Sequence, residues 1–267
     1  MDRRRVSLTD NRTSPRPGSL LAATLVAFSV HFPAEAQEAG DSDVMTSQGN
    51  LVVHPIHHGS LSLTWLDTTV LVDPAPAPGA AEGSDVTAEY TALPVPDLIV
   101  VTHEHGDHFN PDILKAIPDV PIIAPQAVVD KMPDELKSRT TALANGESKT
   151  ISDLLSVDAV PAYNLTEDRQ KFHPKGRDNG YVLTFGNTRV YVAGDTEDVP
   201  EMRALANIDA AFVPMNLPYT MEVEKAAEAV KEFKPAIVFP YHYGESDVNK
   251  FKELVGHASE VRLLKWY

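Results

Sequence analysis

The sequence contains no cysteine, and this absence is the first constraint on its chemistry. Without thiols the protein can form no disulfide bond, and it has neither a thiolate nucleophile nor a thiolate metal ligand. Any metal ion would therefore have to be held by histidine and carboxylate side chains.

Basic side chains are also scarce. The chain has 23 Lys and Arg against 38 Asp and Glu, which gives a formal net charge of −15. An acidic chain repels phosphate backbones and anionic lipids over long range. We therefore expect a small-molecule substrate, no nucleic-acid partner and no stable membrane contact in the mature form. The sequence leaves the oligomeric state open.

Long apolar runs are few, and the run from Leu20 to Val30 is too short to span a bilayer comfortably. Five arginines precede it and Ala34-Glu35-Ala36 follows, a pattern typical of a secretory leader over residues 1–36 that is cleaved before Gln37. We expect an exported protein, periplasmic or secreted, by the general or the twin-arginine route. A disordered tail and an uncleaved anchor are the alternatives.

The rest of the chain is predicted to form a linker and one domain. Residues 37–50 are polar and rich in Gly and Ser, which predicts a flexible linker. From Leu51 to Tyr267 short apolar runs alternate with helical patterns such as Val223–Phe233, where apolar residues recur at helical spacing. This order predicts an α/β domain over residues 51–267 in which sheets are sandwiched between helices.

The densest chemistry lies in "THEHGDHF", Thr102 to Phe109, directly after the apolar run "DLIVV". His103, His105, Asp107 and His108 would stand where a buried strand ends, and that is where open α/β sheets usually hold ligands. Imidazole and carboxylate without sulfur suit zinc, with manganese or iron as alternatives. Solvated loop histidines are the other interpretation, but this pattern has few structural uses.

Three motifs in this order carry a family resemblance: "THEHGDHF", "AGDTE" at Ala193 to Glu197, and "PYHY" at Pro240 to Tyr243. Together they resemble the metallo-β-lactamase superfamily, and most of all its branch of zinc-dependent hydrolases with largely undefined substrates. The resemblance implies an αββα four-layer sandwich, in which two mixed sheets are flanked by helices.

The resemblance also implies roles for single residues. His103 and His105 would bind a first metal, Asp107 and His108 a second, and Asp195 would bridge the two. His242 would complete the second site. The alternative for His242 is a core histidine, and the alternative for Asp195 is a residue that only forms a turn. The superfamily usually places the third histidine of the first metal between the first two motifs, and the resemblance therefore implies His173, the only histidine there. If His173 is instead a surface loop residue, a single-metal site follows.

One or two divalent metals predict hydrolysis by a metal-bound hydroxide, which Asp107 or Asp195 would orient and deprotonate as catalytic residues. The predicted substrate bond is an ester, a lactone or a phosphodiester. One alternative is a β-lactamase-type amide hydrolase, which the lack of cysteine and Phe109 after His108 disfavour. The other is a non-catalytic periplasmic metal-binding protein.

Further residues are predicted to surround the metals. His58 lies in "HHGSL", a turn whose histidine lies close to the metal site in related proteins, so it should line the site or support a ligand. Candidates for the substrate pocket wall are Tyr163, Asn164, Lys175, Asn216 and Tyr219. Lys175 and Arg177 could stabilise a phosphate or carboxylate, although exposed loop cations are more often only solvated.

Overall fold

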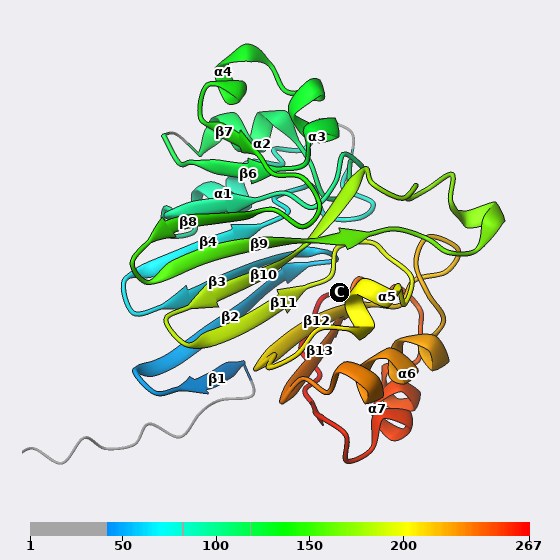
Figure 1. Cartoon of the computed structure of the whole chain (residues 1–267). Helices are drawn as coiled ribbons and strands as arrows, with labels where there is room; N and C mark the ends of the chain where they lie inside the picture. Colours follow the sequence, from blue (N-terminus) through cyan, green and yellow to red (C-terminus); the bar gives the residue numbers. More distant parts are fainter. Residues whose placement is uncertain (1–41, 82, 118) are drawn as a thin grey trace, which may run out of the picture. The chain divides into compact units, whose positions relative to one another are not determined.

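The computed structural model describes residues 42–81, 83–117 and 119–267, and the predicted leader lies outside them. In this part of the chain two seven-stranded sheets pack face to face. Helices cover the outer face of each sheet (Figure 1). The αββα arrangement that was expected from the sequence is confirmed.

The strands follow the chain in order, the first seven in one sheet and the last seven in the other. They are β1 (Asp43–Thr46), β2 (Gly49–His57), β3 (Ser60–Trp65), β4 (Thr68–Val72), β5 (Leu98–Val100), β6 (Ile122–Ala124), β7 (Thr140–Ala142), β8 (Ser148–Ser152), β9 (Leu155–Ala162), β10 (Asp178–Phe185), β11 (Thr188–Val192), β12 (Ala210–Pro214), β13 (Ile237–Tyr241) and β14 (Glu260–Val261). The α-helices are α1 (Ala88–Thr91), α2 (Pro111–Ala116), α3 (Gln126–Lys131), α4 (Asp134–Lys137), α5 (Pro200–Arg203), α6 (Val223–Phe233) and α7 (Val248–Val255), with a 3-10 turn η1 (Glu167–Arg169).

The two sheets share one topology. In the first, β1 to β4 pair antiparallel and β4 to β7 pair parallel. In the second, β8 to β11 pair antiparallel and β11 to β14 pair parallel. Parallel strands end at the same edge of their sheet, so residues that follow β4, β5, β11 and β13 are brought to common edges.

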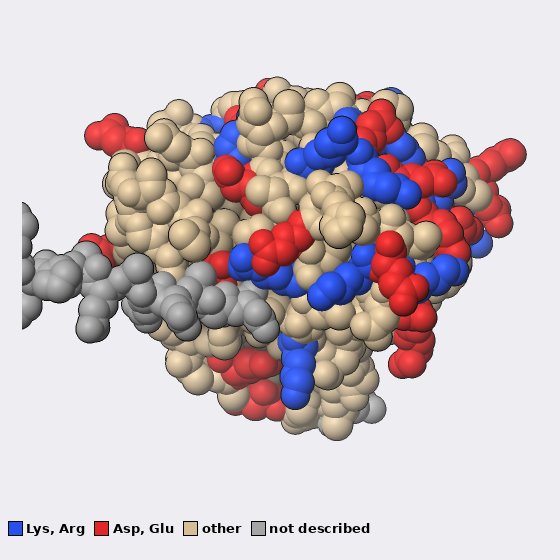
Figure 2. Space-filling view, turned by 90° about the horizontal axis from the view of Figure 1, so that it is seen from below, with Lys and Arg blue, Asp and Glu red and all other residues tan. Residues whose placement is uncertain are grey.

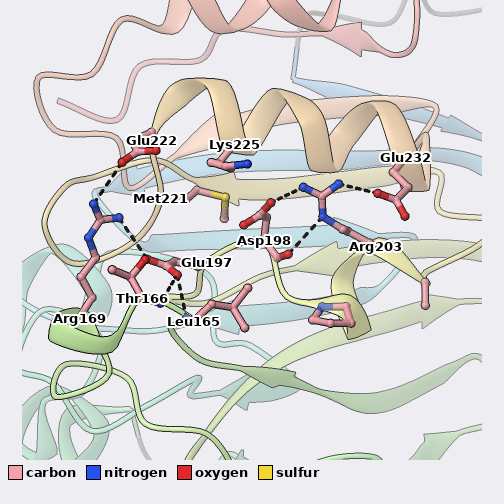
Figure 3. A pocket seen from close by; sticks show the side chains of 12 residues that line it. Leu165, Thr166, Arg169, Glu197, Asp198, Arg203, Met221, Glu222, Lys225 and Glu232 are labelled. Atoms are coloured by element: carbon pink, nitrogen blue, oxygen red, sulfur yellow. Dashed lines mark hydrogen bonds and ion pairs between the residues drawn. The ribbon is translucent and has the colours of Figure 1, made fainter.

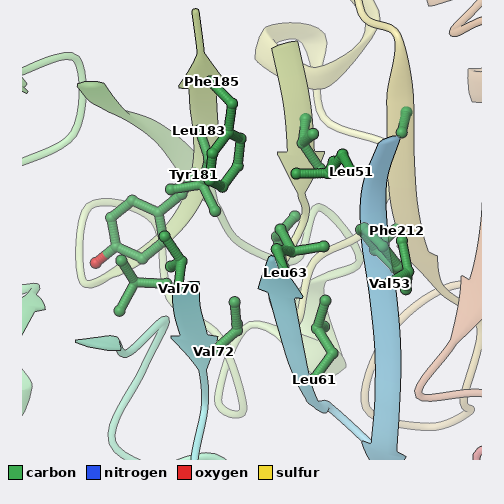
Figure 4. Packing of buried hydrophobic residues seen from close by; sticks show 14 of the residues in the cluster. Leu51, Val53, Leu61, Leu63, Val70, Val72, Tyr181, Leu183, Phe185 and Phe212 are labelled. Carbon is green, nitrogen blue, oxygen red and sulfur yellow. The ribbon is translucent and has the colours of Figure 1, made fainter. Parts of the chain in front are cut away.

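The central strands are buried on both faces, which explains their continuous apolar runs. In β5, Leu98 and Val100 point into the core between the sheets, whereas Ile99 packs under the helices outside. In β12 Phe212 points inward and Val213 outward in the same way. Figure 4 shows the inner layer, to which β2, β3, β4, β10 and β12 contribute aliphatic and aromatic side chains.

The helices that lie next to the site begin as their sequences predict. Asn110 caps α2 by accepting hydrogen bonds from the N–H groups of Asp112 and Ile113, and Pro111 occupies the first turn. Helix α6 spans Val223–Phe233 as predicted and buries its apolar stripe against the second sheet. None of the helices in the described ranges is both long and apolar enough to cross a membrane.

The prediction of a flexible linker over residues 37–50 is wrong for its second half. Asp43–Thr46 form β1, which pairs with β2, and β2 itself begins at Gly49. Val44 is buried in the inter-sheet core, and Trp65 donates its indole N–H to Thr46 Oγ1 at 3.0 Å. The segment has no strong alternation of its own, and its order comes from the neighbouring strand and from Trp65.

Candidate metal centre

The predicted ligands gather where strands of both sheets end. His103, His105, Asp107 and His108 lie in the loop between β5 and α2, and Asp195 and His242 closely follow β11 and β13. The first loop turns tightly, because the N–H groups of His108 and Phe109 both donate to His105 O, at 3.0 and 2.8 Å. The tight turn makes four neighbouring side chains converge.

Two groups of potential ligand atoms match the predicted sites, and a third, of His103, His108 and Asp195, links them. The first contains His103, His105 and His173, and all of its ligand atoms lie within 4.8 Å of one another. The second contains Asp107, His108 and His242, with His58 beside them, within the same limit. His173, whose position the sequence left open, is therefore brought to His103 and His105. That these residues bind metal stays a prediction.

Asp195 stands between the two groups. Its Oδ2 lies 3.4 Å from His173 Nε2 and 4.0 Å from His103 Nε2. Its Oδ1 lies 3.4 Å from His108 Nε2 and 3.4 Å from His242 Nε2. One carboxylate thus offers one oxygen to each group, which is the placement that a bridging ligand requires.

The inward-facing atoms lack ordinary partners. Among the described residues, the buried Nε2 atoms of His103, His108, His173 and His242 and the Oδ1 of Asp195 have no hydrogen-bond partner. Buried polar atoms are almost always paired, so several orphans aimed at one place indicate a missing ligand. Imidazole nitrogen and carboxylate oxygen are donors that divalent metal ions accept. The residues present therefore fit one or two divalent cations.

A buried carboxylate that the sequence analysis missed supports both groups. Asp73 follows β4, and its Oδ2 accepts hydrogen bonds from His108 Nδ1 at 2.7 Å and from Thr102 Oγ1 at 2.6 Å. Its Oδ1 accepts the N–H of Thr102 at 2.7 Å. Thr102 Oγ1 lies 2.9 Å from His103 Nδ1. The only signal for Asp73 in the sequence was its place at the end of an apolar run.

These contacts decide the tautomers of three histidines. A carboxylate oxygen accepts, so in these two hydrogen bonds His108 and His173 carry a hydrogen on Nδ1 toward Asp73 and Asp178. Thr102 gives its hydroxyl hydrogen to Asp73, so its oxygen accepts the Nδ1–H of His103. When these rings are neutral, the lone pair of each Nε2 faces the centre, and this is the arrangement that metal-binding histidines adopt.

Burial and neighbouring charge act on the centre in opposite directions. Burial lowers the pKa of His103 and of His105, so both are neutral at pH 7 and ready to bind a cation. Burial also disfavours charge on His108, but the carboxylates of Asp195 and Asp73 prevail and raise its pKa to about 10. The pKa of Asp195 is held well below its usual range, since the surrounding imidazoles outweigh its burial.

His58 supports Asp107 through a short chain of hydrogen bonds. His58 Nε2 lies 3.1 Å from Asp107 Oδ2, and the ionised carboxylate can only accept this bond. Burial lowers the pKa of His58, so the ring is neutral and its Nδ1 is an acceptor. The hydroxyl of Tyr267, 2.7 Å away, must then donate to Nδ1 while it accepts the N–H of Gly244 at 3.0 Å.

A cavity of about 490 Å³ opens onto the centre. Its lining includes His58, Asn216 and Tyr219, as the sequence predicted, together with Phe172 and Pro78, which it did not. His105, Asp107, His173 and Asp195 from the two groups complete it.

Three other predicted wall residues do not line this cavity. Tyr163 points instead to Glu201, to which it donates at 2.9 Å. Lys175 has a side chain that is 66% exposed, and it contacts the Tyr163 hydroxyl and Glu201. Asn164 is buried and donates to the carbonyls of Tyr219 and Arg169. The positions of these three residues in the sequence did not reveal which way the chain turns after β9.

A second cavity, of about 560 Å³, lies beside α5 and α6 and is shown in Figure 3. Arg169 pairs there with Glu197 and Glu222, each at 3.1 Å. The other carboxylate oxygen of Glu197 accepts the N–H groups of Leu165 and Thr166, both at 2.8 Å. This network fastens the segment that leads to His173 onto the loop that carries Asp195.

Comparison with known proteins finds metal-dependent hydrolases among the relatives of this chain. Residues 68–243 match the model of the family described as beta-lactamase superfamily domain. A UPF0173 metal-dependent hydrolase from Pyrococcus horikoshii is 33% identical over 179 residues, which cover 63% of this chain and 78% of that protein. Another from Lysinibacillus sphaericus is 28% identical and covers 78% of this chain and 93% of that protein.

Solved structures agree with this result. The crystal structure of a candidate metal-dependent hydrolase from Parabacteroides distasonis is 43% identical, covers 83% of this chain and 96% of that chain, and superposes with a TM-score of 0.73. Igni18, a metallo hydrolase from Ignicoccus hospitalis, is 23% identical over 80% of this chain and 94% of its own, with a TM-score of 0.66. At that identity the second structure is similar in fold alone.

Proposed function

This chain belongs to the metallo-β-lactamase superfamily and is a metal-dependent hydrolase, and from that premise we propose that it cleaves an uncharged carboxylic ester or lactone. The observation that carries the proposal is the charge of the cavity. Its lining includes Asp107 and Asp195, and none of its described residues is a lysine or arginine.

Two nearby cations are engaged elsewhere, and a third, Lys171, has its Nζ 5.0 Å from the ring centroid of Phe172 and does not belong to the lining. Arg177 contacts both oxygens of Asp178, at 2.7 and 2.9 Å, and Lys175 contacts Glu201 at 3.4 Å. A phosphodiester brings a permanent negative charge that the bound metal ions alone would have to receive, because the described lining offers no guanidinium or ammonium. An ester or lactone brings no such charge and needs no cationic side chain, so this lining favours the neutral substrate.

We propose that the metal is zinc, with manganese or iron as alternatives, because all donors are nitrogen and oxygen. His103, His105 and His173 would hold one ion, and Asp107, His108 and His242 the other, with Asp195 shared. When bound, such ions supply Lewis acidity and lower the pKa of a coordinated water toward neutrality.

The chain's own groups would orient the reactants. Burial opposes charge on Asp107, but the imidazole of His242, 3.6 Å away, and the hydrogen bond from His58 prevail and lower the pKa of this carboxyl. Asp107 and Asp195 therefore stay ionised at neutral pH, and each can accept a hydrogen bond from a water in the cavity. Asn216 lines the same cavity, and its side-chain amide could donate to a substrate carbonyl oxygen.

The test compares γ-nonalactone and p-nitrophenyl hexanoate with bis(p-nitrophenyl) phosphate, each with and without chelator. We expect chelator-sensitive cleavage of the lactone or ester and little of the phosphodiester. Lys175→Ala serves as the control, because it should leave the ester rate unchanged. Preferred cleavage of the phosphodiester, with loss of that activity in Lys175→Ala, would contradict the proposal. Failure to cleave any ester, lactone, amide or phosphodiester would favour a metal-binding protein without turnover.

Metal content tests the two groups. Plasma mass spectrometry of the full chain should find about two equivalents of metal, fewer in His103→Ala, His173→Ala and Asp195→Ala. His257→Ala is a suitable control, because this histidine is exposed and outside both groups. One equivalent that does not change in His173→Ala would mean a single-metal site without that residue.

We propose, from the sequence of residues 1–36, that the protein is exported and acts on a small molecule outside the cytoplasm. The net charge of −15 supports the absence of a nucleic-acid partner. Acidic and basic side chains are interleaved over the face in Figure 2, which argues against a nucleic-acid site on that face. Cell fractionation and amino-terminal sequencing would test export, and a full-length cytoplasmic protein would refute it.

A further inference from the structure

The cavity at the candidate metal centre has an apolar aromatic side. The rings of Phe172 and Tyr219 meet edge to face, with 5.1 Å between their centroids and an angle of 72° between their planes. Pro78 lines the same cavity, while His105 and His173 of the first group face it. A substrate that reaches the metal ligands therefore also meets these two rings.

The two rings are held in place by backbone contacts. Tyr219 N–H donates to Asn216 O at 3.0 Å, and Tyr219 O accepts the amide of Asn164 at 2.8 Å. The N–H of Asn164 donates to His173 O at 2.8 Å, next to Phe172. One buried asparagine thus joins the segments that carry both rings, so their position is part of the fold.

The fold does not use these rings for its core. Neither Phe172 nor Tyr219 belongs to any of the three buried clusters, and Tyr219 is 46% exposed. Exposed apolar side chains beside a few convergent polar groups are typical of a ligand pocket. The volume of about 490 Å³ also lies in the range of small-molecule sites.

We propose that Phe172 and Tyr219 form a subsite for the apolar acyl or aryl group of the substrate. The substrate class is then an ester or lactone with a chain of several carbons or an aromatic ring, and short or strongly polar esters are poor substrates. This inference rests on the proposed function for the bond that is cleaved, but the subsite itself is a binding property.

The test is binding without turnover. Calorimetry of the zinc-loaded full chain would compare acetohydroxamate with hexanohydroxamate, which share a metal-binding head and differ only in chain length. A buried methylene adds roughly fourfold in affinity, so we expect the longer compound to bind at least tenfold more tightly. Tyr219→Ala and Phe172→Leu should remove most of this difference and leave acetohydroxamate affinity and metal content near the wild-type values.

Two controls separate the outcomes. Leu165→Ala removes an equally exposed apolar side chain at the other cavity (Figure 3) and should keep the chain-length preference. Tyr219→Phe keeps the aromatic ring and should also keep the chain-length preference. Equal affinity for both hydroxamates, no binding of the longer one, or unchanged preference in Tyr219→Ala and Phe172→Leu overturns the subsite even if esters are cleaved. A ring-dependent preference in a protein that cleaves no ester or lactone supports the subsite and refutes the proposed bond.

Discussion

Replacement of Asp73 by asparagine should weaken metal binding at both groups. The carboxylate accepts three hydrogen bonds, from Thr102 N–H, Thr102 Oγ1–H and His108 Nδ1–H. An asparagine has one acceptor oxygen and one NH₂ donor. In either orientation its NH₂ faces at least one of these donors, because donors approach both oxygens of Asp73. His108 loses its orientation directly and His103 loses it through Thr102.

The magnitude follows from the role of such supporting residues. Loss of a carboxylate behind a metal-binding histidine typically costs 10- to 100-fold in affinity, or about 1.4–2.8 kcal/mol. A buried donor left without an acceptor costs a further ~1–3 kcal/mol of folding free energy. We expect the loss of metal affinity in Asp73→Asn to lie toward the upper end of the 10- to 100-fold range for the second group, because Asp73 contacts His108 directly.

Zinc titration of chelator-stripped protein against a chromophoric chelator measures the affinities, and thermal unfolding of the metal-free protein measures stability. Asp178→Asn is the matched control, because Asp178 contacts only His173 among the predicted ligands, at 3.0 Å, and should weaken the first group alone. If Asp73→Asn bound two equivalents with affinities within twofold of wild type, the tautomer argument would be refuted.

Three further predictions concern the same centre. A Cβ on Gly59 would lie 2.5 Å from His108 Cε1, so Gly59→Ala should displace this ring and lower metal content by about one equivalent; an unchanged content would show that the ring can move without loss. Tyr267→Phe removes the donor to His58 Nδ1. Because a hydrogen bond contributes about 1 kcal/mol, kcat should fall about fivefold at unchanged metal content, whereas loss of metal would make His58 a ligand. His108 has its pKa raised to about 10, so it is protonated at pH 7.5 without metal and must be neutral to bind. Calorimetry in buffers of different ionisation enthalpy should therefore find about one proton released on metal binding, with affinity that rises with pH up to that pKa; no release would contradict the raised pKa.

Much of the centre was predictable because it is local. His103, His105, Asp107 and His108 fall within six positions, and the apolar run before them marks the end of a buried strand. The α/β class and helix α6 followed from periodicity in the same way, whereas the αββα sandwich followed from the family resemblance of three motifs. The ligand roles themselves stay predictions until metal is measured.

The supporting residues were not predictable, because they meet only across long stretches of chain. Asp73 reaches His108 over 35 positions, and Tyr267 reaches His58 over 209. Neither residue has a local pattern that marks it. The prediction that Tyr163 and Lys175 line the substrate pocket was wrong for a related reason. A loop can carry nearby residues to opposite sides, and here both side chains contact Glu201 instead of the cavity.

The sequence by itself determined what chemistry is available: histidine and carboxylate without thiol, placed at the ends of apolar strands, in an acidic chain. Only the tertiary structure decided which of these groups face one another. The parallel strands of two similar sheets end near one place, so Asp195 lies between ligands from separate loops and Asn164 sets two aromatic rings beside them. The physical reason is that side-chain period is a property of a short segment, whereas the register between strands and the direction of loops depend on the packing of the whole domain.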